Sequence, residues 1–159
     1  MPAPSDPMTM QAGAIALWLL YGLISFVIAG KVMFSAQGAM YLANSFVFTL
    51  CALTMAFLIS SIFNNKEAVN GIVNVVALGS AFLCGAFIPV EWLPDGVLAV
   101  GRIFPAYWYI QTNEYLKTLE TVSVSGLKPV FLNMLVMAGY GVFYIIVANI
   151  VSAKKRVVA

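Results

Sequence analysis

Long apolar stretches separated by short polar ones dominate the pattern along the chain. Between Asp6 and Lys31 no side chain is charged, and about 20 consecutive apolar residues are enough to cross a bilayer as a helix. The pattern predicts four such membrane-spanning helices, at residues 12–30, 40–63, 68–88 and 129–153. The remaining ends are predicted to be an N-terminal tail at 1–11 and a short basic tail at 154–159.

The stretch between the third and fourth predicted spans, residues 89–128, has a different pattern. It begins apolar but contains Pro94, Arg102 and Pro105, and prolines and charges disfavour a spanning helix. Aromatic side chains typical of a membrane interface crowd it: Trp92, Phe104, Tyr107, Trp108 and Tyr109. Its second half is predicted to be a polar helix at 111–120 followed by a loop at 121–127. We therefore predict a re-entrant helical segment here instead of a fifth span.

Composition supports this interpretation. The 159 residues are 62% hydrophobic and only 9% charged, whereas soluble domains are about half apolar and a quarter charged. The predicted fold class is an all-α, polytopic membrane helix bundle of about four transmembrane helices with the re-entrant segment before the last span. A net charge of +2 and the absence of a basic stripe exclude a nucleic-acid partner.

The chemistry-bearing residues exclude most enzyme classes. Histidine is absent, and Cys51 and Cys84 lie in apolar runs without metal-ligand spacing. The chain has no paired carboxylates, no Ser–His arrangement, no HExxH motif and no phosphate-binding loop. We therefore predict no catalytic, cofactor-binding or metal-binding residue, and any energy source must come from a partner or be absent. An intramembrane enzyme is the least supported hypothesis.

Small and polar residues recur at helical spacing inside two of the predicted spans. One row comprises Ser45, Thr49, Ala52, Ala56 and Ser60; the other comprises Asn70, Asn74, Ala77, Ala81 and Gly85. Helices in lipid pack closely through small residues and form hydrogen bonds between amides. Asn70 and Asn74 are therefore predicted to be helix-packing residues, with a polar substrate path as the alternative.

The end of the third span carries the most specific pattern. Gly85, Phe87 and Pro89 are followed by Leu93-Pro94, an apolar stretch, and Pro105 before three aromatics. Upstream, residues 60–68 (SSIFNNKEA) form a short polar turn. These features, taken in this order over about residues 40–153, resemble the permease subunits of ABC-2-type ABC transporters.

The resemblance implies a function and partners. The chain would be the membrane-embedded permease portion of an exporter, forming part of a substrate path that a separate ABC-type ATPase subunit drives. Its spans would correspond to the third to sixth of a six-span permease, so the earlier helices, or a second permease copy, would be needed beside it in the membrane lipid. It also implies a multi-pass plasma-membrane location with both termini cytoplasmic and the re-entrant segment outside.

The resemblance further implies an outer gate formed around the re-entrant segment. Its residues would be Gly85, Pro89, Glu91, Trp92, Pro94, Pro105, Tyr107, Trp108 and Tyr109. The alternative function, from a different class, is a small four-helix membrane scaffold or accessory protein without transport activity. An adjacent ATPase gene would favour the permease.

Overall fold

The computed structural model describes residues 7–119, 123 and 126–158, and all the regular structure in these residues is helical. The elements in chain order are α1 (Pro7–Ala29), η1 (Gly30–Phe34), α2 (Ala36–Ile62), α3 (Lys66–Cys84), η2 (Val90–Trp92), α4 (Asp95–Gly101), α5 (Pro105–Thr118) and α6 (Lys128–Val158). Four helical stretches are long and apolar enough to cross a membrane, at Ala12–Phe34, Ala36–Ile62, Lys66–Cys84 and Lys128–Lys155. The fold is thus a polytopic helical bundle.

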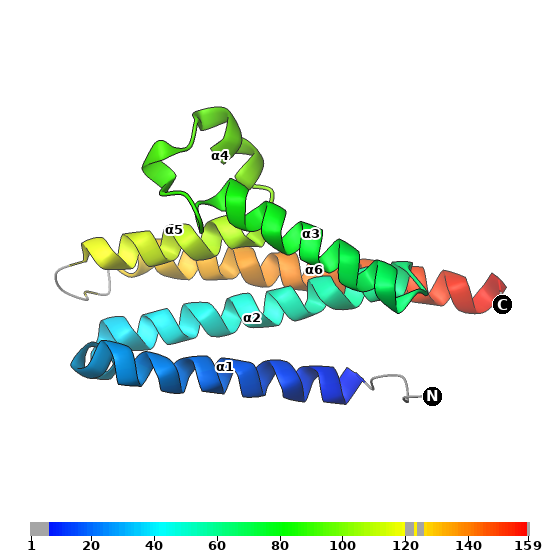
Figure 1. Cartoon of the computed structure of the whole chain (residues 1–159), viewed down its shortest axis with the longest axis horizontal. Helices are drawn as coiled ribbons and strands as arrows, with labels where there is room; N and C mark the ends of the chain where they lie inside the picture. The colour runs from blue at the N-terminus through cyan, green and yellow to red at the C-terminus, as the bar shows by residue number, and fades with distance from the viewer. Residues whose placement is uncertain (1–6, 120–122, 124–125, 159) are drawn as a thin grey trace.

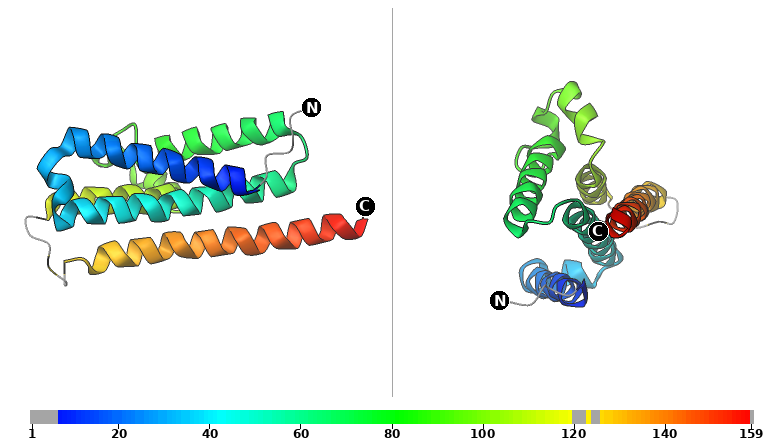
Figure 2. Two further views of the ribbon diagram at one scale, coloured as in Figure 1. Left: turned by 90° about the horizontal axis from the view of Figure 1, so that it is seen from below. Right: turned by 90° about the vertical axis from the view of Figure 1, so that its right-hand side faces the viewer.

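The long helices run up and down side by side (Figures 1 and 2). The start of α1, the α2–α3 turn and the end of α6 gather at one end, which we call the turn end. At the opposite end, the η1 end, lie η1, the end of α5 and the start of α6. The most extensive packing joins α2 with α6, and α5 packs against both. In contrast, α4 projects from the side of the bundle beyond α3 (Figure 1).

Several helices extend beyond the apolar stretches that predicted them. Residues 7–11 belong to α1, α2 begins at Ala36, and α6 continues to Val158. Backbone hydrogen bonding continues a helix past the apolar run wherever no breaker intervenes. The connection between the first two long helices is the 3-10 helix η1 followed by Ser35. The Ser35 side chain caps α2 by accepting a hydrogen bond from the Gly38 amide at 3.2 Å.

The third long helix ends four residues before the predicted end of the span at Ile88. The cause is Gly85, which follows Cys84 in the left-handed conformation with φ of 94°, where a residue without Cβ is favoured. At its start, the Asn65 side chain caps α3 by accepting from the Glu67 amide at 2.9 Å. With 19 residues, α3 is about 28 Å long, close to the thickness of a bilayer's hydrocarbon core.

The predicted re-entrant stretch forms η2, α4 and α5. Pro105 occupies the first turn of α5, where its missing N–H costs no hydrogen bond. This helix unites the aromatic residues and the polar residues that the sequence pattern separated, because nothing breaks it between Ile110 and Gln111. The predicted loop at 121–127 lies mostly outside the described residues.

A lysine joins the last long helix to the α2–α3 turn. Lys155 Nζ donates to the Ile62 carbonyl at 2.9 Å and to Asn64 Oδ1 at 2.8 Å. The last carbonyls of a helix lack hydrogen-bond partners within it and carry partial negative charge. The Lys155 ammonium of α6 supplies both a donor and a positive charge to the end of α2. We call this contact the Lys155 clasp.

Candidate functional site

Hydrogen bonds from α2 hold α5 in the bundle. Three polar side chains of α2, about one turn apart, donate to backbone carbonyls of α5 that are also about one turn apart. The pairs are Gln37 Nε2 to Leu116 O, Tyr41 OH to Asn113 O (3.3 Å) and Asn44 Nδ2 to Tyr109 O (3.1 Å). Asn44 Nδ2 also donates to Asn113 Oδ1 at 2.9 Å. This polar ladder explains how a helix with a polar sequence packs between α2 and α6.

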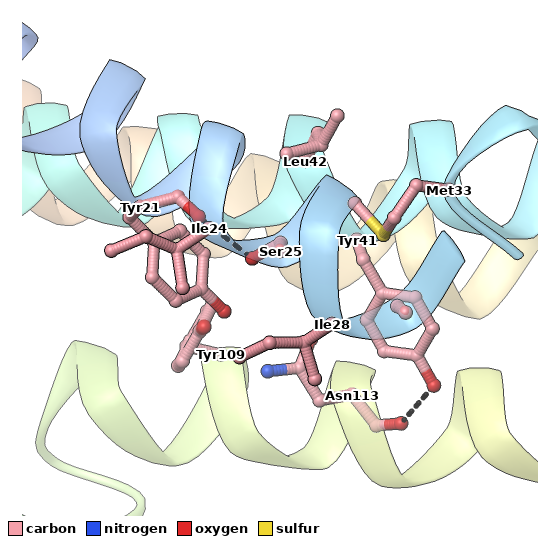
Figure 3. A pocket seen from close by; sticks show the side chains of 10 residues that line it. Tyr21, Ile24, Ser25, Ile28, Met33, Tyr41, Leu42, Tyr109 and Asn113 are labelled. Carbon is pink, nitrogen blue, oxygen red and sulfur yellow. Dashed lines mark hydrogen bonds between the residues drawn. The ribbon is translucent and has the colours of Figure 1, made fainter.

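A hollow of about 360 Å³ opens between α1 and the α2–α5 pair, near the η1 end (Figure 3). Its lining includes the polar side chains of Tyr21, Ser25, Tyr41 and Asn113. In Figure 3, the rings of Tyr21 and Tyr109 lie close together, and Tyr41 reaches across to Asn113. Volumes of about 300–1,000 Å³ are typical of small-molecule sites.

A second hollow of about 310 Å³ adjoins the first and shares Tyr21 and Tyr109 with it. It lies farther from η1, and its lining is mainly apolar, including Ala14, Leu17 and Phe48. Together the two hollows form one groove along α1, which we call the α1 groove. Its lining is mainly apolar throughout, with Ser25, Tyr41 and Asn113 added near the η1 end.

The predicted outer-gate residues separate into an exposed and a buried group. Glu91 and Trp92 are exposed on η2, with Trp92 at 77% exposure. Pro89 and Pro94 are exposed at the starts of η2 and α4. These four residues lie on the projecting part of the chain and not in the α1 groove.

The three consecutive aromatics of α5 have different surroundings. Tyr107 is buried in a cluster with Cys84, and Trp108 Nε1 donates to the Arg102 carbonyl at 3.1 Å. Tyr109 stacks on Phe48 with ring centroids 4.6 Å apart and lines the groove. The structure thus places Tyr109 alone among the predicted gate residues in the α1 groove, and the gate role of the others stays a prediction.

The predicted packing residues Asn70 and Asn74 are exposed on α3. Neither amide has a hydrogen-bond partner among the described residues. The described part of this chain offers these amides no packing partner, and their role as helix-packing residues stays a prediction.

Tyr109, Ser45 and Thr49 were named from the sequence in other roles, and the remaining groove and ladder residues were missed. Gln37, Tyr41 and Asn44 do follow helical spacing at the start of an apolar helix, which is a detectable signal. Their acceptors lie 65 to 79 residues away in α5. A local sequence pattern does not show which distant residues pair.

Charged chemistry near the groove is limited to the η1 end. Glu114 and Lys117 of α5 form an exposed ion pair one turn apart, and the hydrogen bond that Lys117 donates to the Glu114 carboxylate raises the pKa of the Lys117 ammonium. Lys31 on η1 is exposed and has no ion-pair partner in the described ranges. Among those residues, no group of three His, Cys, Asp or Glu side chains could hold a metal ion.

Bundle and sequence together define a multi-pass helical membrane protein. The family model for the ABC-2 family transporter protein matches residues 9–150. The chain belongs to this family, as its resemblance to ABC-2 permeases predicted. Neither a curated protein nor a solved structure matches it.

Proposed function

We propose that this chain is the membrane-embedded permease portion of an ABC-2-type exporter, forming part of a substrate path driven by a separate ATPase subunit. Family membership supports a permease-type component of a transporter. The observation that supports a substrate path is a pair of exposed amides, Asn70 and Asn74, on a helix apolar enough to span a membrane.

The amides need a polar partner. An amide facing lipid without a hydrogen bond is costly, and these two lie one turn apart on the same face of α3. A second permease copy related by a two-fold axis would bring the same amides against them. The substrate path would then run between the two copies along α3, with Asn70 and Asn74 packing at its side.

The direction of the bundle follows from length and charge. Because α3 is about as long as the bilayer core is thick, the segment after Gly85 would reach the opposite surface from the α2–α3 turn. Lys66, Lys154 and Lys155 lie toward the turn end, which would be cytoplasmic by the positive-inside tendency. The ATPase would bind there, and the proposed outer gate around Glu91 and Trp92 would face outside the cell membrane.

Cysteine cross-linking in native membranes tests the path. The permease would be expressed with the earlier helices supplied, fused or in trans, and with the ABC ATPase from an adjacent gene. Asn74→Cys should form a disulfide-linked dimer, and the cross-link should suppress ATP hydrolysis by the co-purified ATPase. Val75→Cys is the matched control, because Val75 is 71% exposed but lies on another side of the helix.

Two results would count against the proposal. Equal cross-linking at positions 74 and 75 would mean random collision and no defined interface. Failure of any ABC ATPase to co-purify with the complete assembly would remove the transport function itself.

A further inference from the structure

We propose that the α1 groove binds a phospholipid of the surrounding bilayer, with an acyl chain along α1 and an anionic headgroup at the η1 end. This site is separate from the proposed substrate path, because it lies on the α1 side of α2 and involves none of the α3 amides.

The surroundings of α1 point to lipid. Its outward face carries large apolar side chains that are mostly exposed, such as Val27 at 81% and Leu23 at 64%. None of the apolar window of this candidate span is buried. Nothing in the described part of this chain covers that face, so we infer that the groove beside it opens toward the hydrocarbon of the bilayer.

The groove is mainly apolar, as an acyl chain requires, and gains the side chains of Ser25, Tyr41 and Asn113 toward the η1 end. The inner hollow offers Ala14, Leu17 and Phe48 to a hydrocarbon chain. Toward η1, Ser25 and Tyr41 join the lining. Their hydroxyl hydrogens are already donated to the Tyr21 and Asn113 carbonyls, so the headgroup preference rests on charge.

Charge favours an anionic headgroup over a neutral one. Lys31 lies on η1 between Ala29 and Met33, which both line the groove. Its ammonium has no ion-pair partner among the described residues. Lys117, the other lysine near this end, is already paired with Glu114. An unpaired lysine at the interface attracts lipid phosphate.

Quenching by brominated lipid tests the chain position. With Trp92→Phe and Trp108→Phe, the remaining tryptophan is Trp18, which lines the inner hollow. In nanodiscs containing increasing amounts of phosphatidylglycerol with a brominated acyl chain, half-maximal quenching of Trp18 should occur at about a tenfold lower mole fraction than for ordinary lipid contact.

The control protein also has Trp92 and Trp108 replaced by Phe and carries Trp18→Phe and Leu19→Trp. The indole then keeps its depth in the membrane but lies at a position that is 58% exposed and outside the groove. Identical mole-fraction dependence at positions 18 and 19 would overturn the site, as ordinary surface lipid would explain it. So would an absence of quenching at Trp18, which would indicate that a protein segment covers the groove.

Native mass spectrometry supplies a measurement on the chain with its tryptophans intact. Ala14→Phe should fill the inner hollow and reduce retained phosphatidylglycerol several-fold, while Ala16→Phe, exposed and outside the lining, should not. Lys31→Gln should remove the preference for phosphatidylglycerol over phosphatidylcholine, whereas Lys66→Gln at the turn end should preserve it. Equal lipid retention by the two alanine variants, or an unchanged preference in Lys31→Gln, would contradict the proposal.

Discussion

At the scale of single residues, the close approach of the Gly101 and Leu83 backbones fixes the corner between α3 and α4. A Cβ on Gly101 would lie 2.7 Å from the Leu83 carbonyl oxygen, closer than real Cβ atoms come. Cys84 Sγ also contacts the Gly101 carbonyl, at 3.6 Å. The corner therefore depends on the absence of a side chain at this position.

Gly101→Ala should lower the free energy of unfolding by about 1–3 kcal/mol, because the clash is with backbone that cannot rotate away. Gly96→Ala, in the same helix with nothing within 4 Å of its Cβ, should instead be neutral or stabilising by up to about 1 kcal/mol. Thermal unfolding in detergent, followed by circular dichroism, compares the two. Equal destabilisation would mean that the approach to Leu83 is not what matters.

The amide of Asn44 is the last donor of the polar ladder and is fully buried. Asn44→Leu removes two hydrogen bonds to α5, so we expect a loss of about 0.6–1.7 kcal/mol, the measured range for such bonds between membrane helices. Asn149→Leu, exposed on α6, is the control. Unfolding in mixed micelles measures both variants, and an unchanged stability of Asn44→Leu would show the ladder to be dispensable.

At the scale of elements, the sequence predicted what depends on local pattern. Four long helices and a broken segment follow from apolar runs, Pro94, Arg102 and Pro105. The sequence did not predict that α3 ends before Gly85 and not near Pro89. Both residues can stop a helix, and only the left-handed backbone of Gly85 shows which of them does so. The α1 groove did not follow either, because its lining comes from α1, η1, α2 and α5, whose packing depends on contacts distant in sequence.

The Lys155 clasp joins α6 to the α2–α3 turn, and the adjacent Lys154 provides a control. Lys155→Met should lower the melting temperature by a few degrees, because the end of α2 loses the donor to its Ile62 carbonyl. Lys154→Met leaves the clasp intact and should have no such effect. A melting curve of each variant in the same detergent decides, and equal shifts would indicate a general effect of charge.

At the scale of the whole molecule, the bundle has two distinguishable ends. We expect Asp95→Cys and Glu114→Cys to react with an impermeant maleimide from the same side of the membrane, and Asn64→Cys to react from the other. The reason is that α3 lies between the α2–α3 turn and the segment carrying the first two positions. Labelling of positions 95 and 114 from opposite sides would mean that residues 89–128 cross the bilayer.

The Lys155 clasp also has a consequence for the order of assembly. The Asn64 side chain and its lysine are separated by 91 residues, which a ribosome adds in roughly 5 to 20 seconds. During that interval the α2–α3 hairpin is already made, yet the carbonyl at the end of α2 must be satisfied by water. The hairpin therefore enters the membrane with an open end, and the closing of this end by α6 is a late, post-insertion step of folding.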